Sequence, residues 1–137
     1  MLSYQIKSKS IKGEKAIAHV NNGELFFDAS AGREDGLANP AELLLTSLAA
    51  CILKNVERFS EILKYEYVSA EIVVDGKRND APPYISEINY SLKVESTMDR
   101  NKLNLLHKNI LKFGTITNTL SKATELNGTI DYISKSN

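Results

Sequence analysis

The chain has 137 residues, of which 42% are hydrophobic and 25% charged, a composition typical of one globular domain with its own core. Its 17 lysines and arginines balance its 17 aspartates and glutamates, whereas a nucleic-acid-binding domain usually carries an excess of positive charge. We therefore expect a single domain over residues 1–137 that does not bind nucleic acid.

The sequence also lacks the patterns that direct a chain into or across a membrane. No apolar run reaches the roughly 20 residues that span a bilayer, and Met1–Ser10 lacks the apolar core of a signal peptide. The single cysteine, Cys51, cannot form an intrachain disulfide, and the two histidines, His19 and His107, lie far apart without ligand partners at metal spacing. We expect a cytoplasmic protein with no membrane partner, no metal and no cofactor.

Three short strands are predicted near the start of the chain. Apolar residues alternate with polar ones over residues 4–9, and Ala16, Ala18 and Val20 share one side of a second run. Asn21-Asn22-Gly23 then predicts a hairpin turn into a strand over residues 25–27, because Asn and Gly tolerate positive φ. The pattern indicates a three-stranded meander, followed by a polar, glycine-rich loop over residues 29–38.

A long helix is predicted to start at Asn39-Pro40. Asn is a good N-cap, Pro is favoured at the first helical position, and Glu42 lies in the first turn, where the helix dipole favours negative charge. Apolar residues then recur at three- and four-residue steps from Leu44 to Leu63. The side chains from Thr46 to Cys51 are nearly all small, so we expect a buried central helix that another backbone approaches closely.

Two longer strands and a second helix are predicted next. Period-two patterning indicates strands over Tyr67–Asp75 and Ile85–Glu95, with an irregular loop over Gly76–Tyr84 between them. Asp99 is expected to cap a helix with an apolar stripe, which Gly114 interrupts before a further helical stretch.

The chain is predicted to end in a strand. Asn127-Gly128 is typical of a turn and is followed by a strand-like run over Thr129–Ile133. The order of strands, helix, strands, helix and strand indicates an α+β fold with a mostly antiparallel sheet.

One run of the sequence resembles a known family. Residues 36–51, GLANPAELLLTSLAAC, closely resemble the G-x-x-N-P-E-E-L-L-x-x-S-L-A-A-C signature of the OsmC/Ohr family of thiol-dependent peroxidases. Residues 76–94 resemble the family's strand-loop-strand region, and Thr115–Leu120 resembles its second helix. The resemblance implies an OsmC-like α+β fold, with mostly antiparallel sheets around two main helices, the first central and buried, and an intertwined homodimer.

The resemblance also implies which residues form the site. Family members carry a peroxide-reactive cysteine on the central helix, with an arginine from the preceding loop and a glutamate near the helix start. Cys51 matches the cysteine, and Arg33 is the best match to the arginine. The position directly after Pro40 holds Ala41, and Glu42 comes one place later, a shift that rotates a helical side chain by about 100°. The candidate catalytic residues are therefore Cys51, Arg33 and Glu42.

Gly114 is the main departure from the family pattern. Fully active members have a C-P-V-S-N-T-L-like run on the second helix, and its cysteine forms a disulfide with the peroxide-reactive one. This chain has Gly114 at that position, so a two-cysteine cycle cannot run within the chain. Either an external thiol reductant restores Cys51, or the redox activity is lost.

Two functions therefore remain open. The first is thiol-dependent reduction of a hydroperoxide in oxidative-stress defence, with Cys51 as nucleophile, Arg33 as thiolate stabiliser and an external thiol as reductant. The second is a non-catalytic OsmC-like protein that binds a small hydrophobic ligand. Gly114 favours the second reading, and the intact signature around Cys51 favours the first.

Three spatial expectations follow from the resemblance. A homodimer should cover the helix from Pro40 to Leu63. Cys51 should lie in a largely buried pocket near that interface, with Arg33 reaching towards it. Gly114 should face Cys51 across an unfilled space where a second sulfur would sit.

Overall fold

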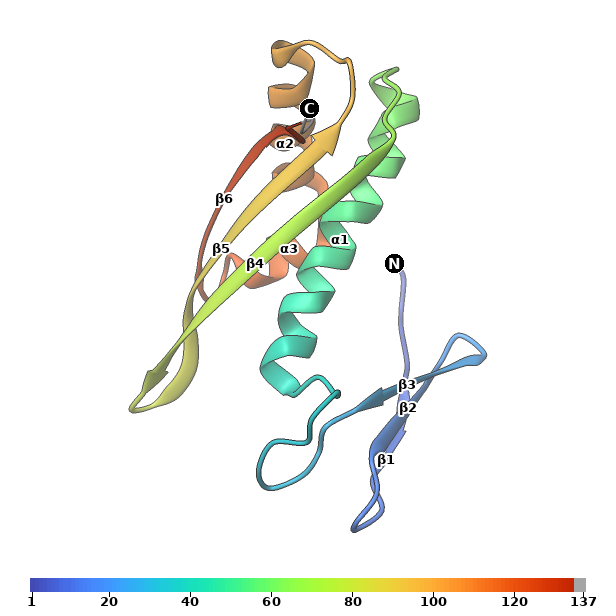
Figure 1. Ribbon diagram of the computed structural model, residues 1–137, viewed down its shortest axis with the longest axis vertical. Helices are drawn as coiled ribbons and strands as arrows, with labels where there is room; N and C mark the ends of the chain where they lie inside the picture. Colours follow the sequence, from blue (N-terminus) through green and yellow to red (C-terminus); the bar gives the residue numbers. More distant parts are fainter. Residues whose placement is uncertain (135–137) are drawn as a thin grey trace. The chain divides into compact units, whose positions relative to one another are not determined.

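The computed structural model describes residues 1–134 of the chain and shows an α+β fold, as the sequence predicts (Figure 1). The chain divides into two compact units, Met1–Leu44 and Leu45–Asn137, and the division falls within the first helix. The elements, in chain order, are β1 (Lys7–Lys9), β2 (Ala16–Val20), β3 (Gly23–Phe27), α1 (Pro40–Ile62), β4 (Ser69–Asp80), β5 (Pro83–Glu95), α2 (Arg100–Phe113), α3 (Thr115–Leu120) and β6 (Glu125–Tyr132).

The first unit contains the predicted meander, an antiparallel sheet in the order β1-β2-β3. Val20 pairs with Gly23, so Asn21 and Asn22 alone form the turn between β2 and β3. Their φ angles are 45° and 61°, and positive φ at both central residues is what a type I′ turn requires. The hairpin prediction is confirmed, with Gly23 as the first residue of β3.

The first strand is shorter than the alternation over residues 4–9 predicts. Pairing begins with Lys7 opposite His19, so Ile6 would lie opposite Val20, the last residue of β2. The chain turns immediately after Val20, so residues before Ile6 have no residue of β2 opposite them.

The second unit contains the larger sheet, in the order β4-β5-β6. β4 and β5 form an antiparallel hairpin, while β6 lies along the other side of β5 and runs parallel to it. The parallel pairing arises because α2 and α3 connect β5 to β6, and a connection of this length can return the chain to the starting end of the sheet. The other strand pairings are antiparallel, as expected.

The prediction of an irregular loop over residues 76–84 is wrong, because β4 and β5 continue through this segment. Pairing extends to Asp80 opposite Pro83, which leaves only Ala81 and Pro82, joined by a cis peptide bond, at the turn. The hairpin therefore projects beyond the start of β6 (Figure 1). Composition is misleading here because Pro83 is the first residue of its strand, where a missing N–H is tolerated.

The predicted turn at Asn127-Gly128 is also wrong, because both residues lie inside β6. Gly128 pairs with Tyr90 of β5, and a Cβ atom added to Gly128 would lie 2.0–2.2 Å from atoms of the Tyr90 ring. The glycine is thus needed for the ring to lie across the neighbouring strand, and not for a turn.

Tyr90 also links this sheet to α2. Its hydroxyl lies 2.6 Å from Nε2 of His107, and the two rings meet edge to face at a centroid distance of 5.7 Å. Burial raises the pKa of Tyr90 to about 12 and lowers the pKa of His107. The phenol and the imidazole are therefore both held in their neutral forms.

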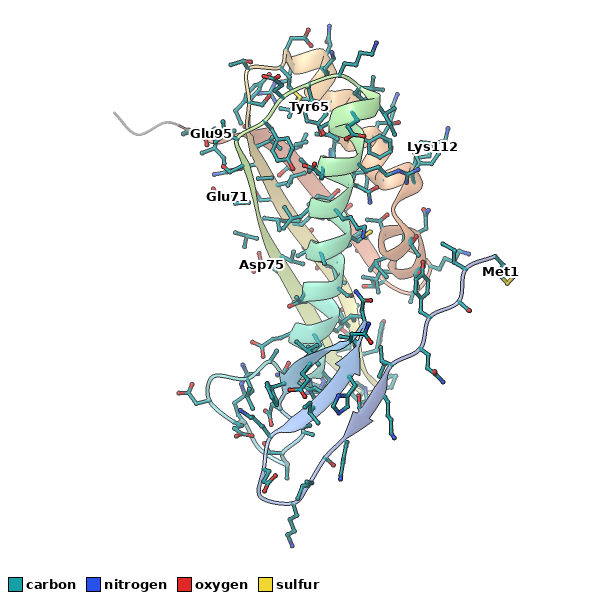
Figure 2. All side chains as sticks on the ribbon, turned by 90° about the vertical axis from the view of Figure 1, so that its right-hand side faces the viewer. Met1, Tyr65, Glu71, Asp75, Glu95 and Lys112 are labelled. Atoms are coloured by element: carbon teal, nitrogen blue, oxygen red, sulfur yellow. The ribbon has the colours of Figure 1, made fainter. Side chains whose placement is uncertain are left out.

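The core of the second unit lies between the sheet and the helices, which cover one face of it (Figures 1 and 2). Alternate residues of β5 meet the apolar faces of α1 and α2, and the fully buried hydrophobic side chains are Leu48, Ile52, Val56, Ile88, Leu92, Val94, Leu103, Leu106 and Ile110. Glu71 and Asp75 of β4 are exposed and point away from α1 (Figure 2).

The predicted burial of α1 is seen along one face. Leu48, Ile52 and Val56 are 0% exposed, whereas Thr46 and Ala50 on the opposite stripe are exposed in the single chain.

The second helix begins as predicted. Asp99 is its N-cap, and a carboxylate oxygen accepts a hydrogen bond from the backbone N–H of Lys102 at 2.8 Å. Gly114 ends α2 and begins the short helix α3, with its own N–H donating to the carbonyl of Ile110. No helix within residues 1–134 is both long and apolar enough to cross a membrane.

Candidate functional site

The start of α1 is held by a reciprocal pair of hydrogen bonds. The Asn39 side chain accepts from the Glu42 backbone N–H at 2.9 Å, and the Glu42 carboxylate accepts from the Asn39 backbone N–H at 3.0 Å. This arrangement is a capping box, which satisfies two of the backbone N–H groups left free at a helix start. It confirms the predicted N-cap and gives Glu42 a defined orientation.

Glu42 also binds Arg33, so two of the predicted site residues lie together. A guanidinium nitrogen of Arg33 lies 2.5 Å from a carboxylate oxygen of Glu42, and both side chains are about half exposed. The hydrogen bond from Arg33, together with that from the Asn39 backbone, lowers the pKa of Glu42, and the same carboxylate raises the pKa of Arg33. The one-place shift from the family position of the glutamate does not prevent this ion pair.

The loop that carries Arg33 is ordered by a buried aspartate. Asp28 is 3% exposed, and its carboxylate accepts hydrogen bonds from the Ser30 hydroxyl, the Ser30 N–H and the Glu34 N–H. These bonds, the hydroxyl first, lower the pKa of Asp28. Because these hydrogen bonds hold the backbone on both sides of Arg33, the arginine side chain projects from an ordered turn.

Cys51 lies near the middle of α1 and is half-buried. It is too far along the helix to benefit from the dipole at the N-terminus, which acts within about one turn. Asn55, one turn further along, donates from Nδ2 to the Cys51 carbonyl at 2.8 Å and approaches the sulfur at 3.7 Å. A neutral amide therefore lies beside the thiol.

Gly114 lies directly against Cys51, as the sequence predicts. A Cβ atom built on Gly114 would be 3.3 Å from the Cys51 sulfur. The prediction of an empty space beside Gly114 is wrong, because the same Cβ would lie 2.4 Å from Oγ1 of Thr117 and 2.8 Å from the Ile110 carbonyl oxygen. Thr117 is 1% exposed and its hydroxyl donates to the Gly114 carbonyl at 2.7 Å, so it fills much of the space a second cysteine would need.

Sequence reasoning missed the roles of Asn55 and Thr117. A signal was available for Asn55, since it is a polar residue on the apolar stripe of α1, four residues after Cys51. No sequence signal pointed to Thr117, because its contact with Gly114 depends on how α3 folds back after α2. Among residues 1–134 there is no group of three or more His, Cys, Asp or Glu side chains placed to hold a metal ion.

The arrangement is suited to thiol chemistry. The second unit offers a half-buried thiol with an amide donor beside it. The first unit separately carries an ion-paired arginine and glutamate on its loop and helix start.

Comparisons with known proteins identify a family match for the sequence. Residues 32–127 match the family model described as OsmC-like protein. That range includes Arg33, Glu42, Cys51, Asn55 and Gly114. A comparison with curated protein sequences finds no significant match.

Several solved structures share the fold. An OsmC-like protein from Mycoplasma pneumoniae is similar with a TM-score of 0.87 and 19% identity, over 97% of this chain and 99% of that one. An organic hydroperoxide resistance protein OsmC from Legionella pneumophila has a TM-score of 0.71 and 16% identity, over 96% and 99% of the two chains. The organic hydroperoxide resistance protein OhrB of Bacillus subtilis has a TM-score of 0.67 and 17% identity, over 94% and 98%.

Proposed function

The chain belongs to the OsmC-like family, and from that membership we propose that it reduces organic hydroperoxides with Cys51 as its only redox-active cysteine. The observation that carries the proposal is the half-buried Cys51 at the end of the signature run, on a fold shared with two hydroperoxide resistance proteins. The proposed role is defence against oxidative stress in the cytoplasm.

The proposed reaction has two stages. The Cys51 thiolate attacks one oxygen of the hydroperoxide, the O–O bond breaks, and the other oxygen leaves with a proton as an alcohol, giving a sulfenic acid on Cys51. An external thiol then attacks the sulfenic sulfur, releasing water and forming a mixed disulfide. A second thiol group of the reductant attacks that disulfide, restores Cys51 and leaves as an oxidised disulfide.

Arg33 is proposed to stabilise the thiolate and the developing negative charge on the leaving oxygen. Its guanidinium is paired with Glu42, and Glu42 is fixed by the capping box, so the arginine is held by one carboxylate with its remaining N–H groups available as donors. The proposal therefore includes an approach of the Arg33 guanidinium to the Cys51 sulfur.

Peroxide consumption by the purified protein tests this function. With a dithiol such as dithiothreitol as reductant, the wild type should consume an organic hydroperoxide catalytically, and Cys51→Ser should not. Arg33→Gln should be strongly impaired, while Arg58→Gln, which removes an exposed arginine of α1, should behave as the wild type. Equal consumption by the wild type and Cys51→Ser would refute the proposal.

A second candidate function is that of a non-catalytic family member that binds a small hydrophobic ligand. Gly114 supports it, because no second cysteine is available to complete an internal disulfide cycle. A wild type that keeps a free Cys51 thiol but does not consume peroxide with any dithiol would favour this function over the first.

We also propose that the protein is a homodimer in which the exposed stripe of α1 is covered. The small residues Thr46 and Ala50 lie one turn apart on that stripe, and both are exposed in the single chain. Light scattering coupled to size exclusion should give the dimer mass at micromolar concentration, and a stable monomer would contradict the proposal.

A further inference from the structure

Asn55 occupies a position on α1 where an apolar residue would be expected. It is 7% exposed and lies between Ile52 and Val56, both fully buried, on the face of the helix that meets the sheet. A buried amide without partners destabilises a fold, so such a residue is retained where its hydrogen bonds matter. The Asn55 amide nitrogen contacts both the carbonyl oxygen and the sulfur of Cys51.

The orientation of this amide is fixed by chemistry. The Cys51 carbonyl oxygen can only accept a hydrogen bond, so the group 2.8 Å from it must be the NH₂ of Asn55 and not its oxygen. The same nitrogen carries a second hydrogen and lies 3.7 Å from the Cys51 sulfur. The sulfur therefore faces a donor, which can bond to a thiolate much more strongly than to a neutral thiol.

We propose that Asn55 is a positioning residue whose amide donor selectively stabilises the thiolate form of Cys51 over the neutral thiol. The inference rests on the proposed function for its biological use, but its physical content concerns the thiol alone. It assigns part of the thiolate stabilisation to the second unit itself, independent of Arg33.

A purely structural role makes a different prediction. If Asn55 only filled space on the helix face, an apolar side chain of similar shape would serve as well, and such exchanges are often neutral for stability. The two roles therefore separate in the variant Asn55→Leu, which keeps the branched shape of the side chain and removes both N–H donors.

The experiment measures the rate of Cys51 alkylation by iodoacetamide as a function of pH, without any peroxide. In Asn55→Leu the midpoint of the profile should move up by roughly one pH unit, so that alkylation below the midpoint is about tenfold slower. Asn55→Asp, which has the same shape but adds negative charge, should move the midpoint further up. Asn104→Leu removes an exposed amide of α2 and should leave the profile unchanged.

Coincident profiles for the wild type and Asn55→Leu would overturn the inference. If the leucine variant does not fold, Asn55→Asp gives the same comparison, and a midpoint at or below that of the wild type would be decisive against it. A shifted profile in a protein that consumes no peroxide would refute the peroxidase proposal alone. Normal peroxide reduction with unshifted profiles would refute this inference alone.

Discussion

The sulfur of Cys51 lies 3.3 Å from the position that a Cβ atom on Gly114 would occupy. In a disulfide the Cβ atom of one residue lies about 3 Å from the sulfur of the other, given the usual bond lengths and dihedral angles. The backbone of α2 and α3 thus brings Gly114 to the place that a second cysteine would require.

Gly114→Cys should therefore form a disulfide with Cys51 only when the neighbouring hydroxyl is removed. Alone, the new Cβ meets Thr117 Oγ1 and the Ile110 carbonyl, and we expect a loss of about 1–3 kcal/mol from the free energy of unfolding. Adding Thr117→Ala removes the closest atom. Free-thiol titration after mild oxidation should show the bond in the double variant, with Thr117→Ala alone as the control. Two persisting free thiols in a folded double variant would contradict the assigned geometry.

Peroxide treatment of the wild type without reductant should over-oxidise Cys51. No second thiol exists in the chain to trap the sulfenic acid, so excess peroxide should carry it to sulfinic and sulfonic acids. Mass spectrometry of the Cys51 peptide should detect these forms, and prior addition of a dithiol should prevent them. The Gly114→Cys, Thr117→Ala double variant should be protected. An unmodified Cys51 after prolonged exposure would show that the sulfur does not react with peroxide.

The parts of this fold that the sequence predicts are those governed by neighbouring residues. The capping box depends on Asn39 and Glu42, three positions apart, and the turn at Asn21-Asn22 depends on residues that accept positive φ. The placement of Cys51 on α1 follows from the periodicity of the helix in the same way. The family resemblance adds Arg33, whose partner Glu42 the structure shows.

The failures occur where contacts between distant residues override local preference. Asn127-Gly128 has the composition of a turn, yet the ring of Tyr90, on another strand, requires a glycine inside β6. Asp80 and Pro83 read as loop residues, yet their pairing completes a long hairpin. Thr117 fills the space beside Gly114 through a fold-back of α3 that no local pattern indicates.

Gly128→Ala should strongly destabilise the protein. Its Cβ would lie 2.0–2.2 Å from the Tyr90 ring, which is itself 4% exposed and has little room to move. We expect a loss of about 2–3 kcal/mol in the free energy of unfolding, measured by urea denaturation. Combining it with Tyr90→Ala should give less than the sum of the two single losses, because the clash is already gone. Strict additivity would show that the ring is not the obstacle.

Glu42→Gln should separate the two roles of the glutamate. Glutamine can still accept from the Asn39 N–H, so the helix start should be kept, but it loses the charge that holds Arg33. We expect peroxide reduction to fall by roughly tenfold to a hundredfold with little change in Tm. Glu42→Ala should lower both activity and Tm, and Glu61→Gln, in the last turn of α1, should change neither. A Gln variant with full activity would show that the ion pair does not serve the site.

His107 should make the stability of the protein depend on pH in a defined window. Burial lowers its pKa below the ordinary value of 6.5, so the folded protein binds this proton less readily than the unfolded chain. The contribution of the neutral imidazole is thus complete above about pH 6.5 and is lost as the pH falls from there towards the lower pKa of the folded state.

In His107→Gln the side chain can still accept from the Tyr90 hydroxyl but does not titrate. The difference in Tm between wild type and variant should therefore change in favour of the variant between pH 7 and roughly pH 5, while carboxylates that titrate in both proteins cancel. Parallel curves across this range would mean that the imidazole is no harder to protonate in the folded protein than in the unfolded chain.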